Sequence, residues 1–231
     1  MTGCLPGRVP LNWYRNNVTV SLELLDVFIR NVESQIELSI QEFKIKKETL
    51  SLDEEPEFNY SRIIDIHLGL DSETFDLENI FTEYFPSIQR RSAFLSLYGF
   101  LEHELDNLCA LFKKTENLKV DLRESNHWGI ERSIKYLEIV AGLTIDTGND
   151  KWGKVKSINK IRNLLIHNDG KLDDIDGNPK KKERNILKQN KYLSGDYEII
   201  FSKGYLSFVL KTFNDFFKYL DELIQNRCEP T

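Results

Sequence analysis

Long apolar runs are absent from this 231-residue sequence, as are the usual signs of secretion and of disulfide bonding. No run approaches the roughly 20 apolar residues that a membrane span needs, and the first 17 residues contain no signal-peptide-like apolar stretch. The three cysteines are an odd number at wide spacing, which argues against a disulfide framework and for a reducing compartment. We therefore expect a cytoplasmic protein that does not enter a membrane.

The composition also lacks the features of a disordered or many-domain chain. Hydrophobic residues make up 40% of the sequence, with 14 Phe and 9 Tyr, which is ample for a packed interior. The length suits one hydrophobic core better than two, and neither an internal repeat nor a dividing linker is present. The sequence therefore predicts a single domain over residues 1–231.

Positive charge is scarce overall but concentrated in one segment. The net charge is −6, yet residues 151–191 contain twelve Lys or Arg and five Asp or Glu, so that segment carries +7 and the remainder −13. A basic segment on an acidic body is one form that a phosphate-binding surface takes. A solvated, lysine-rich loop would give the same composition, so charge alone leaves both interpretations open.

Apolar residues at three- and four-residue intervals predict a mostly α-helical fold. The predicted helices cover residues 19–50, 86–114, 130–141, 154–167 and 206–224, with a short one over 75–85. Residues 51–86 are mixed and acidic, and residues 173–182 form a polar loop. Residues 186–193 and 197–201 flank a Ser-Gly-Asp turn and predict a small β-hairpin. The expected architecture is an antiparallel helical bundle with a small β-hairpin insert.

The helix predicted over 154–167 has a polar stripe beside its apolar face. On a helical wheel Lys156, Lys160, Asn163 and His167 fall close together, opposite the apolar arc. Asn163 lies one turn before His167, close enough for its amide to orient the imidazole. Because histidine changes charge near neutral pH, His167 can donate or accept a proton there.

Arg162 interrupts the apolar arc of the same helix. It falls between Ile158 and Ile166, and a buried arginine is costly unless it is paired. Glu104 lies on the apolar stripe of the 86–114 helix, with Glu102 beside it, so we expect a buried ion pair between the two helices. Such a pair could serve packing alone.

The directions of the two side chains predict a dimer. Arg162 and His167 are about 140° apart on one helix, so a single copy cannot easily aim both at one substrate atom. Two copies related by a two-fold axis could bring them together in a shared cleft.

The string Arg162-Asn163-Leu164-Leu165-Ile166-His167 resembles the RxxxxH signature of HEPN-domain ribonucleases. Arg162, Asn163 and His167 match that family's arginine, its frequent next-position polar residue and its histidine. The Asn-Asp-Gly that follows is similar to stand-alone prokaryotic members, and residues 90–102 resemble the long helix that packs on the motif helix. The resemblance covers a HEPN-like core over 86–226 and leaves 1–85 as an N-terminal helical extension packed on the bundle.

The resemblance implies a metal-independent endoribonuclease without a cofactor. The ribose 2′-OH would attack the adjacent phosphate and leave a 2′,3′-cyclic phosphate, with His167 as general acid or base and Arg162 offsetting phosphorane charge. It also implies an RNA substrate, tRNA or mRNA, in a toxin–antitoxin or anti-phage setting, with an antitoxin or another defence-system protein as partner. Some family members are catalytically silent binding modules, which is the alternative. The basic segment supplies the expected RNA-binding residues: Lys156, Lys160, Lys180, Lys181, Lys182 and Arg184.

Patterns typical of metal and nucleotide sites are incomplete. The run that begins Glu102-His103-Glu104 has Asn107 where a zinc protease needs histidine. The Asp- and Gly-rich stretch 172–183 resembles a calcium loop but has Leu172 at its first ligand position, so a turn is the better interpretation. A glycine-rich phosphate loop is also missing. The sequence therefore predicts no metal site.

Overall fold

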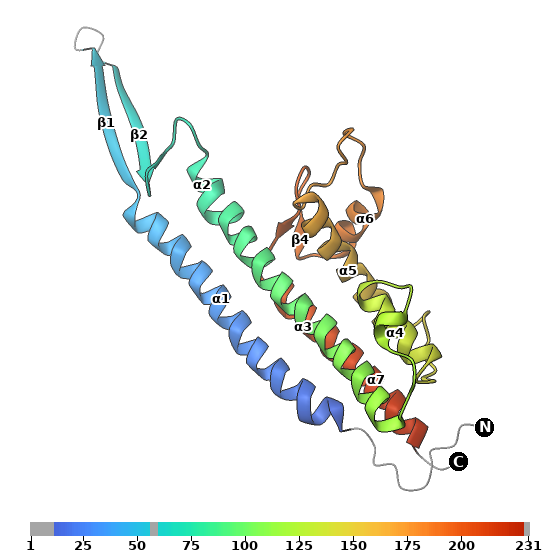
Figure 1. Ribbon diagram of the computed structural model, residues 1–231. Coiled ribbons are helices and arrows are strands. Elements are labelled where there is room, and N and C mark those ends of the chain that lie inside the picture. Colours follow the sequence, from blue (N-terminus) through green and yellow to red (C-terminus); the bar gives the residue numbers. More distant parts are fainter. Residues whose placement is uncertain (1–11, 56–59, 229–231) are drawn as a thin grey trace.

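The computed structural model describes residues 12–55 and 60–228, and it is mostly helical with two small antiparallel sheets. Three long helices form its frame: α1 (Thr19–Lys46), α3 (Phe85–Glu116) and α7 (Tyr205–Cys228). They lie side by side, and each contacts the other two (Figure 1). The predicted mostly-α fold is confirmed. Within the described residues, none of the helices has the length and apolarity to cross a membrane.

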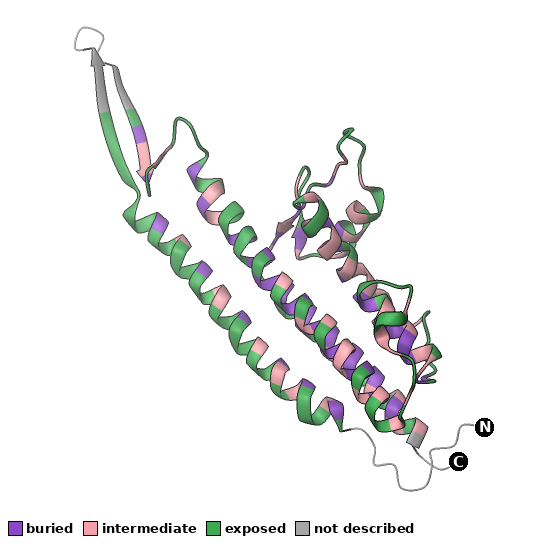
Figure 2. Cartoon of the chain, viewed as in Figure 1, coloured by how far each residue is buried: buried purple, intermediate pink, exposed green. Residues whose placement is uncertain are grey.

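The core lies between these three helices and a second group on their far side. α1 buries only Leu22, Ile29, Ile36 and Phe43, at seven-residue intervals, so one narrow face of this long helix is covered (Figure 2). α3 and α7 lie deeper, and their large side chains are nearly inaccessible to solvent: Phe94, Leu97, Leu105, Phe213, Phe216 and Phe217. Because Leu22 and Ile29 pack into the same cluster, α1 belongs to the main core.

The helix that carries the motif lies on the other side of this layer. α5 (Asp150–Asn168) packs on α7 and α6 (Lys181–Gln189), while α4 (Gly129–Ile139) packs on α3. Asn149 caps the start of α5 by accepting a hydrogen bond from the Lys151 backbone N–H at 2.8 Å. The helix ends where Asp169 (φ 51°) and Gly170 (φ 77°) enter the left-handed region, which confirms the predicted stop.

A β-hairpin at the end of α1 was not predicted. The sequence predicted a helix to residue 50, but α1 ends at Lys46, and β1 (Glu48–Glu55) pairs antiparallel with β2 (Tyr60–His67), which pairs with β3 (Leu70–Asp71). The hairpin projects beyond the bundle (Figure 1). Its base is held by the His67 ring, whose centroid lies 5.2 Å from that of Phe43 and 4.7 Å from that of Phe81.

The chain returns to the bundle through short helical segments. α2 (Leu77–Asn79) and the π-helical η2 (Ile80–Tyr84) lead directly into α3 and account for the short helix predicted over 75–85. Two further short pieces are the π-helical η1 (Tyr14–Val18) before α1 and the 3₁₀ turn η3 (Leu122–Glu124) before α4. Within the region predicted as a helical extension, residues 1–11 and 56–59 lie outside the described part.

The predicted hairpin insert exists in shortened form. β4 (Leu193–Ser194) pairs antiparallel with β5 (Ile200–Phe201), so the turn was placed correctly. The strand predicted over 186–193 is wrong, because residues 181–189 form α6. In α6 only Leu187 is buried, and its other side chains are partly or fully exposed, as in a surface helix.

Two arginines of α3 connect this helix to α1 and to the hairpin of β4 and β5. Arg90 donates to Glu33 of α1 through Nε (3.0 Å) and Nη2 (2.8 Å), and to the Phe201 carbonyl of β5 through Nη1 (3.3 Å). Arg91 pairs with Glu198 and donates to the Ile199 carbonyl. Sequence reasoning missed both, although two adjacent arginines near an apolar stripe were a signal of buried pairing.

We expect Glu33→Ala to destabilise the fold by about 3 kcal/mol, because it leaves a buried guanidinium without its carboxylate. The side chains of Arg90 and Glu33 are only 9% and 13% exposed. Urea unfolding measures the change. The matched control is the double variant Glu33→Leu/Arg90→Met, which removes both charges and should stay within about 1 kcal/mol of the parent. Equal losses in the two variants would contradict a role for this ion pair.

Candidate functional site at the end of α5

The motif residues lie at the C-terminal end of α5, on the side of the bundle away from α1. His167 and Lys160 are exposed, and Lys156 and Asn163 are half-buried. The opposite face of the helix is buried, and it consists of Trp152, Val155, Ile158, Ile161 and Leu164. The wheel therefore separated the polar stripe from the core correctly.

Arg162 is half-buried, and not enclosed as predicted. Its guanidinium carbon lies 5.4 Å from the Tyr98 ring centroid, and Nη1 donates to Asn163 Oδ1 at 3.0 Å. Nη2 lies 3.7 Å from Glu102 Oε2, with the two side chains 28% and 32% exposed. The reason for the difference is Ile166, which the wheel assigned to the core but which is 50% exposed. The apolar face ends before it encloses Arg162.

Glu104 is buried, as its position on the apolar stripe predicted, but it is not the partner of Arg162. It accepts hydrogen bonds from Trp13 Nε1 and from Asn107 Nδ2, both at 3.3 Å. The expected pair with Glu104 is therefore wrong. Glu102, two residues earlier and on the other side of α3, is the carboxylate that lies near Arg162. The buried indole N–H of Trp13, which needs an acceptor, was the signal that could have assigned Glu104.

Tyr98 forms the floor beneath Arg162 and was missed by sequence reasoning. Its hydroxyl donates to Asn159 Oδ1 at 2.7 Å, which fixes the ring between α3 and α5. Burial raises the pKa of Tyr98 well above its ordinary value, and the nearby Glu102 charge raises it further. The phenol therefore stays neutral, and its ring face supports the guanidinium.

His167 has no intramolecular partner in the described part of the chain. No hydrogen bond or ion pair joins it to another described residue, and Asn163, expected to orient it, accepts from Arg162 instead. The imidazole lies five residues beyond Arg162, about 7.5 Å along the helix axis and about 140° around it. An exposed imidazole and a half-exposed guanidinium are thus both accessible to a ligand at this helix end.

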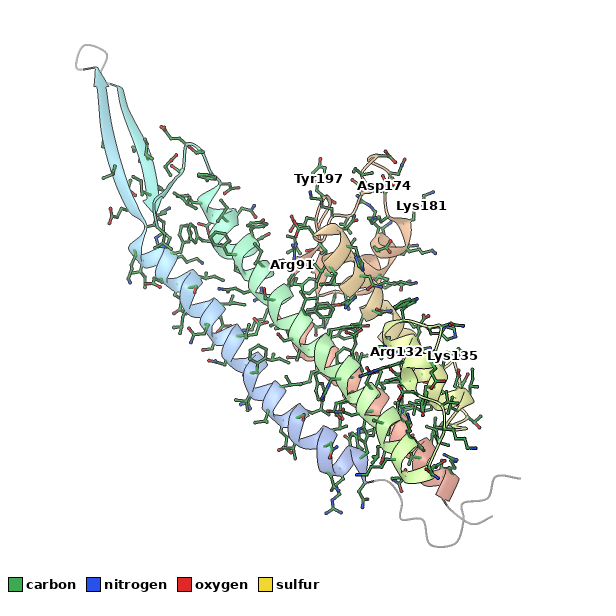
Figure 3. All side chains as sticks on the ribbon, in the orientation of Figure 1. Arg91, Arg132, Lys135, Asp174, Lys181 and Tyr197 are labelled. Atoms are coloured by element: carbon green, nitrogen blue, oxygen red, sulfur yellow. The ribbon has the colours of Figure 1, made fainter. Side chains whose placement is uncertain are left out.

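The basic residues beyond α5 differ in availability. Lys181 and Lys182 are exposed and Lys180 is half-buried, and Lys181 is the first residue of α6 (Figure 3). Arg184 is engaged within the chain, since Nη2 donates to Asp173 Oδ1 at 2.7 Å and to the Asp196 carbonyl at 2.9 Å. Arg184 was expected to bind RNA, but one nitrogen of its guanidinium is already engaged in these two hydrogen bonds within the chain.

The Asp-rich loop forms a turn. Asp174 accepts hydrogen bonds from the backbone N–H groups of Asn178 (2.8 Å) and Asp176 (3.0 Å), and the bond from Asn178 contributes most to lowering the pKa of Asp174. Across residues 12–55 and 60–228, no three His, Cys, Asp or Glu side chains come together as metal ligands would. Burial raises the pKa of Cys109 to about 12, so its thiol stays protonated. Cys4 and the side chain of Cys228 lie outside the described part.

Comparison with protein-family models, curated proteins and solved structures finds no match to this chain.

Proposed function

We propose that this protein is a metal-independent endoribonuclease with a HEPN-like bundle, and that the C-terminal end of α5 is its active site. The observation that carries the proposal is the pair of accessible groups there, the His167 imidazole, which has no partner among the described residues, and the Arg162 guanidinium supported on Tyr98. A proton-transfer group and a cation that can both reach one phosphodiester are what transesterification needs.

The proposed reaction uses no group from outside the protein and the RNA. The ribose 2′-OH loses its proton to a base and attacks the neighbouring phosphorus, and the bond from phosphorus to the 5′-oxygen breaks. The leaving oxygen takes a proton, so the products are a 2′,3′-cyclic phosphate and a 5′-OH. His167 moves the protons, and Arg162 offsets the added negative charge of the phosphorane.

A homodimer suits this chemistry. The reaction needs a proton acceptor and a proton donor, whereas one copy offers a single histidine at the α5 end. Two copies facing one another across a two-fold axis would supply two imidazoles and two guanidiniums to one cleft. The 140° divergence of Arg162 and His167 within one helix supports the same arrangement.

A catalytically silent RNA-binding or protein-binding module is the second candidate. It is favoured by the internal contacts of Arg162 with Tyr98, Asn163 and Glu102, which would also serve helix packing. Such a module would bind RNA equally well with or without His167 and would leave the RNA intact. An antitoxin or another defence-system protein is the partner that we propose for either function.

RNA binding should weaken with salt through the exposed lysines. We expect Lys160→Gln and Lys181→Gln each to flatten the slope of log affinity against log salt by roughly 0.7–0.9, because each removes one phosphate contact. Fluorescence anisotropy with a labelled single-stranded RNA at several salt concentrations measures this slope. The control is Lys211→Gln, an exposed lysine of α7, which should leave the slope unchanged. Identical slopes in all three variants would contradict the assigned surface.

A single missing hydroxyl tests the proposed reaction. An RNA oligonucleotide that the protein cuts at a mapped bond is compared with the same RNA carrying a 2′-deoxynucleotide on the 5′ side of that bond. We expect the bond next to the deoxynucleotide to stay intact while binding is retained, because only the 2′-OH can act as the internal nucleophile. Cleavage at the substituted position would exclude the mechanism.

A further inference from the structure

The outer face of α1 carries an apolar stripe with no partner among the described residues. Five side chains on this face are exposed although apolar: Val20 (55%), Leu24 (68%), Val27 (55%), Leu38 (53%) and Ile45 (81%). They lie opposite the buried face of the helix, at the outer edge of the bundle (Figure 2). Apolar side chains exposed singly are common on proteins, whereas a row of them along one helix face is a feature of interaction surfaces.

The spacing of the stripe is that of a coiled-coil seam. Eight positions of α1 follow one another at alternating steps of four and three residues. Five of them are the exposed apolar side chains, and the other three are the uncharged Asn31, Ser34 and Gln41. The absence of charge from all eight positions contrasts with a chain that is 29% charged. This pattern fits burial against another helix.

The pattern is also symmetric about its own centre. An antiparallel second copy, with its two-fold axis between Asn31 and Ser34, would place each residue opposite one whose number adds to 65. The facing pairs are Val20 with Ile45, Leu24 with Gln41, Val27 with Leu38 and Asn31 with Ser34. Apolar residues then meet in two of the three outer layers, Leu24 meets Gln41 in the third, and the small polar residues meet at the axis of this isologous contact.

Charges beside the stripe favour the same arrangement. Glu23, Arg30, Glu37 and Lys44 follow one another at seven-residue intervals along one flank. In an antiparallel pair this flank meets itself, which brings Glu23 toward Lys44 of the partner subunit and Arg30 toward Glu37 of the partner subunit. A parallel pair would instead bring Glu37 toward Glu42 of the partner subunit, a contact of like charges.

The present contacts of these residues do not oppose the pairing. Arg30 Nε lies 3.1 Å from Asp26 Oδ2, and the two side chains are 70% and 54% exposed. Glu37 pairs with Lys203, and these side chains are exposed to a similar degree. Exposed pairs of this kind exchange partners at little cost.

From these observations we infer that the outer face of α1 is a seam at which two copies of this chain associate antiparallel. The layer of α3 and α7 separates α1 from α5, so the seam leaves the α5 end uncovered (Figure 1). The inference is therefore independent of the proposed ribonuclease activity, and it describes a contact different from one between α5 helices.

The mass of the full chain in solution tests the seam. We expect Val27→Glu/Leu38→Glu to halve the mass that light scattering gives for the wild type at tens of micromolar, with unchanged helicity by circular dichroism. The control, Ile139→Glu/Ile175→Glu, alters side chains that are 75% and 100% exposed elsewhere and should keep the wild-type mass. A monomeric wild type, or an unchanged mass in the α1 variant, would overturn the inference.

The direction of the pairing is tested by cross-linking. In a background with Cys4→Ser and Cys228→Ser, Val20→Cys/Ile45→Cys should form a covalent dimer on oxidation, while Val20→Cys alone should not. In an antiparallel pair the two copies of residue 20 lie about 38 Å apart, far beyond disulfide reach. Efficient cross-linking by Val20→Cys alone, or its absence in the double variant, would contradict the antiparallel seam.

Charge reversal gives a second measure of direction. Glu23→Lys and Lys44→Glu should each raise the concentration of half-assembly by about five- to tenfold, since each change occurs twice in a two-fold dimer. The combined variant should return close to the wild type. Additive losses in the combined variant would exclude the contact between Glu23 and Lys44 of the partner subunit.

Discussion

Replacing His167 by alanine is expected to lower the rate of RNA cleavage by about two to four orders of magnitude, the usual contribution of a general acid or base. The side chain is exposed and has no described partner, so its removal should leave the fold and its unfolding midpoint unchanged. The cleavage rate of a labelled RNA in EDTA, measured beside a thermal unfolding curve, gives both quantities.

Two other exposed histidines provide matched controls. His103 on α3 and His127 before α4 are both accessible to solvent and belong to elements other than α5. His103→Ala and His127→Ala should cleave RNA at the wild-type rate. Full activity of His167→Ala, or equal losses in all three variants, would remove His167 from the proposed mechanism.

Arg162→Ala is expected to slow cleavage by about a hundred- to a thousandfold, as the loss of one group that stabilises transition-state charge does. The stability change should stay under about 1 kcal/mol, since the Arg162 and Glu102 side chains are 28% and 32% exposed and the contact with the Tyr98 ring is a single cation–π interaction. Rate and urea unfolding are measured on the same preparation.

Two conservative variants separate catalysis from packing. Arg162→Lys keeps a charge without the planar guanidinium and should retain part of the rate. Glu102→Gln removes the nearest carboxylate and should leave cleavage undiminished, because the positive charge stays in place. A large stability loss in Arg162→Ala with an unaltered rate would favour a role in helix packing.

The helical frame could be predicted from the sequence because each long helix buries a periodic face. α3 begins one residue before the predicted Pro86 start, and α5 ends at the predicted Asn-Asp-Gly stop. The stop of α5 follows from local chemistry, a left-handed residue followed by glycine after the last turn. The start of α3 does not, because α3 continues from η2 without a break and Pro86 lies in its first turn. Local rules therefore sufficed where the structure depends on neighbours in sequence.

The strands were harder to predict because their packing imposes little pattern. β1 and β2 project beyond the bundle, so no core-facing alternation marks them clearly in an acidic stretch. The segment that became α6 has a short apolar run, Ile186-Leu187, which periodicity alone cannot assign to helix or strand. In both cases tertiary context determined the outcome.

At the site, the helical wheel of α5 predicted that the polar stripe faces solvent, but it could not predict which side chains contact one another. The exposure of Lys160 and His167 follows from helix geometry. The pairing of Glu104 with Trp13 joins residues 91 positions apart, and no local rule reaches that far. The contact of Arg162 with Tyr98 is likewise distant in sequence, since α3 supplies the ring on which the guanidinium lies.

The most direct measurement is mass spectrometry of the ends that the wild-type protein leaves on a defined RNA in the presence of EDTA. The account predicts 2′,3′-cyclic phosphate and 5′-OH ends without added metal, and intact RNA in a parallel reaction with His167→Ala. RNA left intact by the wild type, or 5′-phosphate and 3′-OH ends that appear only after Mg²⁺ or Mn²⁺ is added, would contradict it.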